Sequence, residues 1–308
     1  MTVTESVTVR TRADEMKAVP PLGVLEYLDL CDDKPVRIKR ETAFASALLA
    51  DQIGYRRLWL PEHHSTGAPS SNPLLLAAVL GSHTSRIRVG TAVTLVRIRD
   101  PHLTAEDIAA AGFFCGDRLD VGFGRGDVGG PGSEVLNYLR KDNRETDEAI
   151  RTIVSILDSG CSWIDPIESS YQRWMHGAGT KSAELAGELR FNYCHALFLN
   201  PDLGACLRPL ERYRASFPAG RTAVAVALVA NDDPAKAKRD GERDGVVVMC
   251  AGSAQRCADT VCALLESTGA DEVIITELSS DAKDHHRALK EIFALVAESL
   301  APNTQACP

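Results

Sequence analysis

The chain has 308 residues, 44% of them hydrophobic and 25% charged, which is ordinary for a soluble globular enzyme. Its formal net charge of −8 argues against nucleic acid or an anionic membrane as the main partner. The nine cysteines include no Cys-x-x-Cys pair and no matching Cys/His spacing, which argues against a structural metal site or a disulfide framework.

The first segment shows no periodic pattern. Residues 1–18 are rich in Thr, Val and charged residues, and we expect a flexible N-terminal tail there. No secretory pattern stands near Met1 and no apolar run is long enough to cross a bilayer, so we expect a cytoplasmic protein. Residues 19–302 show no break in composition and predict a single domain, followed by a C-terminal tail at 303–308.

Strands and helices are predicted to alternate along that domain. Apolar or β-branched runs predict strands at 21–28, 58–60, 87–93, 118–123, 171–176, 193–199, 222–229 and 272–276. Helical spacing predicts helices at 43–53, 72–80, 104–114, 145–157, 182–189, 207–217, 254–268 and 285–300. Asn72, Thr104 and Ser253 are the expected helix caps, and the charged stretch 231–245 is assigned to no element.

Eight such units indicate a parallel sheet covered by helices. A closed (β/α)8 barrel agrees with the chain length. An open doubly wound sheet is the alternative, but it normally shows a glycine fingerprint after its first strand, which residues 22–30 lack.

The most informative stretch is LWLPEHH at residues 58–64, in which an apolar strand runs directly into Glu62, His63 and His64. Ligands and catalytic groups of parallel α/β folds lie at the carboxyl ends of the strands. A surface loop with one satisfied histidine is the alternative, and the position at a strand end favours a site. His285 and His286 lie among charged residues and are expected to be solvated.

Two glycine-rich turns follow later strands. GFGRGD at 122–127 surrounds Arg125 with residues that let a ligand approach the backbone, and a guanidinium suits a phosphate. HGAGTKS at 176–182 leads into a helix whose first N–H groups, with Thr180, Lys181 or Ser182, suit a phosphate as well. A simple connection between strand and helix is the equal alternative for this second turn.

These residues carry a family resemblance. GYRRLWLPEHH (54–64), Asn72-Pro73, TSRIRVGTAVTL (84–95), Asp100-Pro101 with Ala105-Glu106, and RLDVGFGRG (118–126) resemble, in order and spacing, the bacterial-luciferase-like flavin monooxygenases. Weaker similarity continues as far as Thr276. The resemblance implies a TIM barrel, luciferase-like, with a shortened insertion region between Gly132 and Tyr171. It also implies reduced FMN, supplied by a flavin reductase, and O2 chemistry through a C4a-hydroperoxyflavin that oxygenates a small organic substrate.

Position by position, the resemblance also implies roles. His63 matches the catalytic histidine and His64 its neighbour, while Arg125 matches the arginine that reaches the flavin phosphate. The remaining cofactor contacts are expected at Glu62, Thr91, Ala92, Gly177, Ala178, Gly179, Thr180, Lys181 and Ser182. The match of 90–93 implies a non-prolyl cis peptide between Ala92 and Val93. The chain departs from the family at Gly177 and Ala178, where relatives often carry serine or glutamate.

Two alternative functions stay open at this point. The first is hydride transfer with a deazaflavin and without O2, and the second is a non-catalytic flavin-binding luciferase-like protein. The expected partners are a small-molecule substrate, the reductase and a second copy of the chain in a homodimer. The sequence does not identify the substrate.

Overall fold

The computed structural model describes residues 20–27, 34–65, 68, 70–126, 128, 131–243 and 245–301. The tails expected at 1–18 and 303–308 lie outside these residues, so the domain boundaries stay a prediction.

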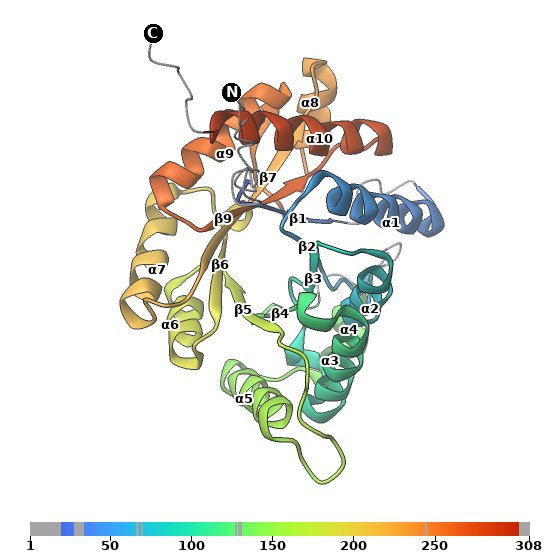
Figure 1. The fold of residues 1–308 in the computed structure, drawn as a ribbon, viewed down its shortest axis with the longest axis vertical. Helices are drawn as coiled ribbons and strands as arrows, with labels where there is room; N and C mark the ends of the chain where they lie inside the picture. Colours follow the sequence, from blue (N-terminus) through green and yellow to red (C-terminus); the bar gives the residue numbers. More distant parts are fainter. Residues whose placement is uncertain are drawn as a thin grey trace, which may run out of the picture.

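Eight parallel strands close into a barrel at the centre of the molecule (Figure 1). Each strand pairs with the next along the chain, and the last pairs with both the seventh and the first, which closes the ring. The (β/α)8 barrel is thereby confirmed. Its strands are β1 (Leu22–Leu25), β2 (Arg57–Leu60), β3 (Arg88–Thr91), β4 (Leu119–Phe123), β5 (Gln172–Gly177), β6 (Asn192–Ala196), β7 (Thr222–Ala230) and β9 (Glu272–Glu277).

Eight helices that the sequence predicts surround this ring (Figure 1). The caps expected at Asn72 and Ser253 are confirmed, since each side chain accepts a hydrogen bond from a backbone N–H in the first turn of the helix that follows it. The helices are α1 (Val36–Ile53), α2 (Pro73–His83), α3 (Pro101–Cys115), α5 (Asn143–Ser159), α6 (Thr180–Leu189), α7 (Leu203–Ser216), α9 (Ala254–Thr268) and α10 (Ala282–Ser299).

The cap expected at Thr104 is wrong. The carboxylate of Asp100 accepts the backbone N–H groups of His102 and Leu103, so α3 begins at Pro101. Thr104 is buried inside the helix, where its hydroxyl donates to the backbone carbonyl of Asp100.

Several elements were not predicted. They are α4 (Pro131–Leu136), α8 (Pro234–Gly241), β8 (Val248–Gly252) and the single 3-10 turns at Val96–Ile98, Gly116–Arg118, Asn137–Leu139 and Leu197–Leu199. Helix α8 lies in the charged stretch that was assigned to no element, and β8 pairs with the second half of β7 outside the ring of eight.

The core has an outer and an inner part. Between strands and helices lies a large apolar cluster that includes Leu58, Val89 and Ile275. Inside the barrel a smaller cluster contains the rings of Trp59 and Trp174, which meet edge to face with 5.7 Å between their centroids. The side chains of the inner cluster fill the middle of the barrel, which leaves the carboxyl ends of the strands for a site.

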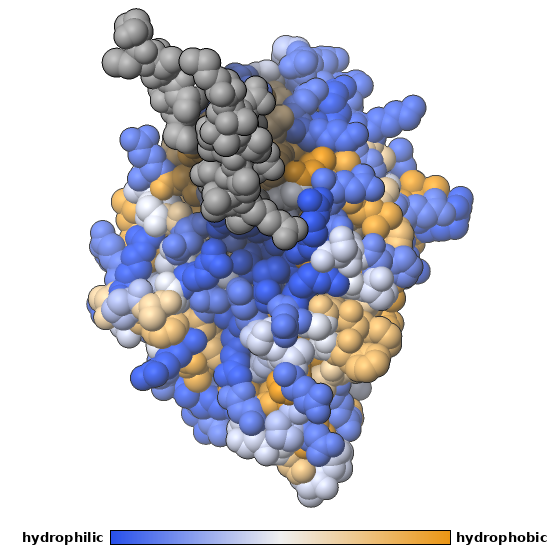
Figure 2. Space-filling view, in the orientation of Figure 1, coloured by the Kyte–Doolittle hydropathy of each residue, from blue (hydrophilic) through white to orange (hydrophobic). Residues whose placement is uncertain are grey.

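One face of the molecule carries mostly hydrophilic residues among those that Figure 2 colours. Figure 2 shows hydrophobic side chains in small separate groups on the face that it displays. Within the described part of the chain, no helix is long and apolar enough to cross a membrane.

Candidate active site

A cavity of about 440 Å³ opens at the carboxyl ends of the strands. This volume falls in the range of roughly 300–1,000 Å³ typical of small-molecule and cofactor pockets. Residues in or just after every strand of the ring line the cavity, among them Leu25, Tyr27, Trp59, His63, Ala92, Val93, Gly124, Arg125, His176, Gly177, Ala178, Ser182, Cys194, Phe198, Ala225 and Ile274. The site therefore lies where the sequence places it.

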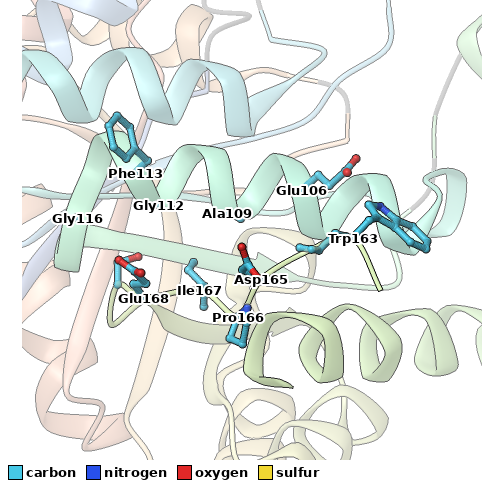
Figure 3. A pocket seen from close by; sticks show the side chains of 12 residues that line it. Glu106, Ala109, Gly112, Phe113, Gly116, Trp163, Asp165, Pro166, Ile167 and Glu168 are labelled. Carbon is cyan, nitrogen blue, oxygen red and sulfur yellow. The ribbon is translucent and has the colours of Figure 1, made fainter. Parts of the chain in front are cut away.

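A second, larger cavity of about 680 Å³ lies outside the barrel. It lies between α3 and the segment at 163–169 (Figure 3). Its lining side chains, such as Phe113 and Trp163, come from a helix and a loop. None of its lining residues belongs to a strand end, so the smaller cavity is the candidate active site.

Glu62 follows β2 and connects neighbouring segments of the chain beside the cavity. Its buried carboxylate accepts hydrogen bonds from His64 Nε2 at 2.8 Å, from the backbone N–H of Leu95 at 2.9 Å and from the guanidinium of Arg99 at 2.8 Å. Burial opposes the charge of Glu62, but these hydrogen bonds outweigh burial and lower its pKa. Glu62 is thus an ionised anchor that ties the end of β2 to the segment after β3.

The structure separates the two predicted catalytic histidines. His63 lines the cavity, and its ring meets that of Tyr27 edge to face with 5.0 Å between centroids. The ring of His64 is turned to Glu62, and His64 is not among the described residues that line the cavity. His64 thus contacts Glu62 beside the cavity, and its catalytic role stays a prediction.

The end of β3 contributes backbone to the cavity. The peptide bond between Ala92 and Val93 is cis, as predicted, and both residues line the cavity. Thr91, expected to contact the cofactor, is instead fully buried: its hydroxyl accepts from the Gly122 N–H at 3.1 Å and from Thr94 Oγ1 at 3.0 Å. Thr91 fastens β3 to β4 beneath the wall.

The part of the cavity that follows β4 and β5 has the features of an anion site. Arg125 lines it, and the carboxylate of Asp147 on α5 accepts from Arg125 Nε at 2.8 Å and from a terminal nitrogen at 2.5 Å. The hydrogen bonds to Asp147 raise the pKa of Arg125, against the effect of burial, so its positive charge is secure.

The first turn of α6 completes this side. Gly177, Ala178 and Ser182 line the cavity, whereas Lys181 in the same turn is exposed. The helix starts at Thr180 after Gly179, which supplies no side-chain cap, so backbone N–H groups of the first turn stay available to a ligand.

Tyr27 and His176 line the cavity, although the sequence predicted no role in the site for either residue. Tyr27 follows β1, and His176 is the penultimate residue of β5, on the same face of that strand as Trp174. Alternation along a predicted strand was the signal that could have found His176, since the inward face of Trp174 is also the face of His176.

His285, expected to be solvated, is buried between two carboxylates. Its Nδ1 lies 2.7 Å from Glu277 Oε2 and its Nε2 lies 3.3 Å from Glu26 Oε2. Burial alone would lower the pKa of His285, but the two carboxylates raise it to about 10. The ring is therefore a buried cation that joins β1 and β9 to α10.

Comparison with known proteins agrees with this geometry. The family model described as luciferase-like monooxygenase matches residues 33–243. A protein named luciferase-like monooxygenase from Escherichia coli (strain K12) is 28% identical over 214 residues, which cover 64% of this chain. The matched part spans 61% of the length of that relative.

Two solved structures share the fold. The oxygenating constituent of 3,6-diketocamphane monooxygenase from Pseudomonas putida, a type II Baeyer–Villiger monooxygenase in complex with FMN, is 19% identical with a TM-score of 0.73, covering 92% of this chain and 100% of its own. A secondary alcohol dehydrogenase that depends on the deazaflavin F420, in complex with an F420–acetone adduct, is 15% identical with a TM-score of 0.67, covering 90% of this chain and 99% of its own.

Proposed function

Because this chain belongs to the luciferase-like monooxygenase family, we propose that it is a flavin-dependent monooxygenase that uses reduced FMN and O2 to oxygenate a small organic substrate. The observation that carries the proposal is the cavity at the strand ends. It joins an apolar interior and an imidazole at His63 to an anion-binding side at Arg125 and α6.

The residues present fit FMN at both of its ends. Leu25, Ala225 and Ile274 give apolar surface suited to a flat ring system, and Ala92 and Val93, joined by a cis peptide bond, line the same cavity. Arg125 and the first-turn N–H groups of α6 suit the phosphate. Backbone donors thus take the place of the serine or glutamate oxygens that residues 177 and 178 do not supply.

Within this proposal the protein contributes position and a dry site. Bound FMN, once reduced, supplies the electrons that activate O2. His63, which can donate or accept a hydrogen bond, would hold a proton next to the substrate. The bonds of Glu62 to His64 and Arg99 keep the strand end that carries His63 in place, and the apolar lining excludes water.

A titration of the purified protein tests this function. Oxidised FMN, reduced FMN and the deazaflavin F420 are added separately, and the visible spectrum and intrinsic fluorescence are followed. We expect the two FMN forms to bind, and product to form only when reduced FMN, O2 and a substrate are present together. Binding of the deazaflavin alone would instead support hydride transfer, as in the F420-dependent relative of this fold. Flavin binding without turnover would support the non-catalytic alternative.

Two protein partners belong to the same proposal. A flavin reductase would supply the reduced FMN, as the family resemblance implies. A second copy of the chain would form a homodimer, which is supported by large exposed apolar side chains on α2 and α3, among them Leu75, Leu103 and Phe113. Sedimentation velocity would show the dimer, and Phe113→Glu should weaken it.

A further inference from the structure

Two cysteines lie in contact at the edge of the sheet. Cys250 stands in the middle of β8 and Cys257 in the first turn of α9, and their two Sγ atoms are 3.8 Å apart. We propose that this pair is a site of reversible oxidation, at which hydrogen peroxide joins the two thiols in a disulfide. The inference does not depend on the cofactor, since neither cysteine is among the described residues that line the candidate active site.

The contact needs only a small movement to become a bond. The sulfur atoms of a disulfide lie about 2.0 Å apart, so the two thiols have to approach each other by about 1.8 Å. Strand β8 can shift by such an amount without opening the barrel, because it pairs only with β7 and stands outside the ring of eight strands. Rotation of either cysteine side chain adds to this movement.

Peroxide has a short way to Cys250. The residue is 7% exposed, and its neighbours Met249 and Ala251 on the same strand are half-exposed. Arg256 and Asp259, which act on the charge of the thiol, are exposed residues of α9. A molecule close to water in size therefore needs only a small local opening at the edge strand to reach the sulfur.

The surroundings give the two thiols different roles. Hydrogen bonds from Cys257 and from the Thr260 hydroxyl, together with the positive charge of Arg256, lower the pKa of Cys250 although burial opposes them. The hydrogen bond to Cys250 and burial raise the pKa of Cys257, which therefore keeps its proton. Because the thiolate is the form that attacks peroxide, Cys250 reacts first and Cys257 second.

Other cysteines of the described chain lack this environment. Burial raises the pKa of the Cys115 and Cys206 thiols to about 11 in each case, and it also raises the pKa of Cys262 on α9. The thiol at Cys161 is exposed. Cys161 is therefore a useful internal standard for oxidation at an open surface.

The oxidation takes place in two steps. The Cys250 thiolate attacks one oxygen of hydrogen peroxide, and the O–O bond breaks to leave a sulfenic acid and a hydroxide ion, which takes up a proton to become water. The Cys257 sulfur then forms the S–S bond, its proton is released to the departing oxygen, and a second water leaves. The two thiols together lose two electrons, and one peroxide is reduced to two waters. The proposed reaction would itself release peroxide whenever reduced flavin reacts with O2 without oxygenating a substrate.

Peptide mapping of the peroxide-treated protein tests the site. The full chain is treated with hydrogen peroxide, denatured, alkylated at its free thiols and digested with trypsin. Trypsin cleaves after Arg256 and so separates Cys250 from Cys257. A disulfide between them appears in the mass spectrum as peptides 244–256 and 257–283 joined together, lighter by two hydrogen atoms than the sum of the two. Cys262→Ser is the control, because the second peptide also contains Cys262.

We expect the joined peptides in wild type and in Cys262→Ser, and their complete loss in Cys250→Ser and in Cys257→Ser. Dithiothreitol should separate the peptides again. In Cys257→Ser the oxidation should stop at the sulfenic acid of Cys250, which dimedone traps. In Cys250→Ser the thiol of Cys257 should stay unmodified.

Two results would overturn the inference. In the first, Cys250 and Cys257 are both still alkylated after the same treatment has oxidised Cys161. In the second, Cys250 is joined to a cysteine other than Cys257. Wild type and Cys262→Ser decide whether the bond forms, and Cys250→Ala replaces Cys250→Ser if the latter does not fold. Neither result bears on the proposed function, which the flavin titration tests separately.

Discussion

His63 lies on the cavity wall with its ring against Tyr27, and of the two histidines after β2 it is the one that faces the cavity. If its imidazole holds a proton during oxygen transfer, His63→Ala should lower turnover by roughly 10²–10⁴, the usual worth of a positioned acid or base. Flavin affinity and melting temperature should stay close to wild type. A larger share of the reduced flavin should react with O2 to give hydrogen peroxide without oxygenating the substrate.

The measurement supplies reduced FMN, O2 and a working substrate, and compares product with peroxide in both proteins. His102→Ala is the matched control, because that ring stacks on Trp163 outside the barrel. Equal product from wild type and His63→Ala would remove His63 from the mechanism.

The buried cation at His285 makes stability depend on pH. Because its pKa is raised to about 10 from 6.5, its contribution to the free energy of unfolding is fully present below pH 6.5 and is lost as pH rises through 10. His285→Leu leaves two buried carboxylates without a counter-charge and should cost about 3–5 kcal/mol at pH 6. Urea unfolding at pH 6, 8 and 10.5 should show this difference shrinking with pH. His83→Leu, at an exposed histidine, is the control.

At the scale of single residues, the sequence predicted several residues that line the cavity. It did not predict the hydrogen-bond partners of the side chains around the cavity. His63, Arg125, Gly177, Ala178 and Ser182 were predicted and line the cavity, whereas Gly179, Thr180 and Lys181 of the same turn are not among the described lining residues. Thr91 and His64 are not among the described residues that line the cavity, because their hydrogen bonds go to Gly122 and Glu62, and no spacing rule reveals such local partners. His285 was misread because its carboxylate partners stand far from it in the sequence or on another element.

At the scale of the elements, the start of α3 gives a prediction. Asp100 accepts two backbone N–H groups of the first turn, so Asp100→Ala should lower the free energy of unfolding by about 0.5–2 kcal/mol. Glu106→Ala on the same helix is exposed and should change it by less than about 0.5 kcal/mol. Denaturant unfolding of the two variants checks this. Equal stability in both would show that the cap at Asp100 contributes nothing.

The elements that the sequence predicted are those with a continuous apolar face. Strands such as β7 and β9 are buried along their whole length and contain long apolar runs, and α9 was predicted to the residue. Helix α8 was missed because only Ala237 and Asp240 are buried on it, which leaves no helical apolar pattern. Strand β8 was missed because it is half-exposed and pairs with only the end of β7.

At the scale of the whole molecule, the barrel has two unlike ends. The cavity opens at the carboxyl ends of the strands, whereas a buried ionic cluster of Arg57, Asp120, Glu272 and Arg88 fills the amino end. Arg57 is central to this cluster: its Nε lies 2.8 Å from Glu272 and a terminal nitrogen lies 2.5 Å from Asp120. One side chain thus joins β2, β4 and β9 across the interior of the ring.

Because the ionic cluster and the cavity lie at different ends of the barrel, we predict that Arg57 contributes to stability and not to flavin binding. Arg57→Met should lower the free energy of unfolding by about 3–5 kcal/mol, because it leaves the buried carboxylate of Glu272 without its cation and Asp120 with Arg88 alone. Flavin affinity per folded molecule should stay near wild type. Arg37→Met is the control, since Arg37 forms an ion pair with Glu41 on the exposed surface of α1 and should cost about 0.5 kcal/mol or less. Unfolding in urea, with flavin titration under native conditions, gives both quantities. A stable Arg57→Met protein that fails to bind flavin would show that the two ends of the barrel are not independent.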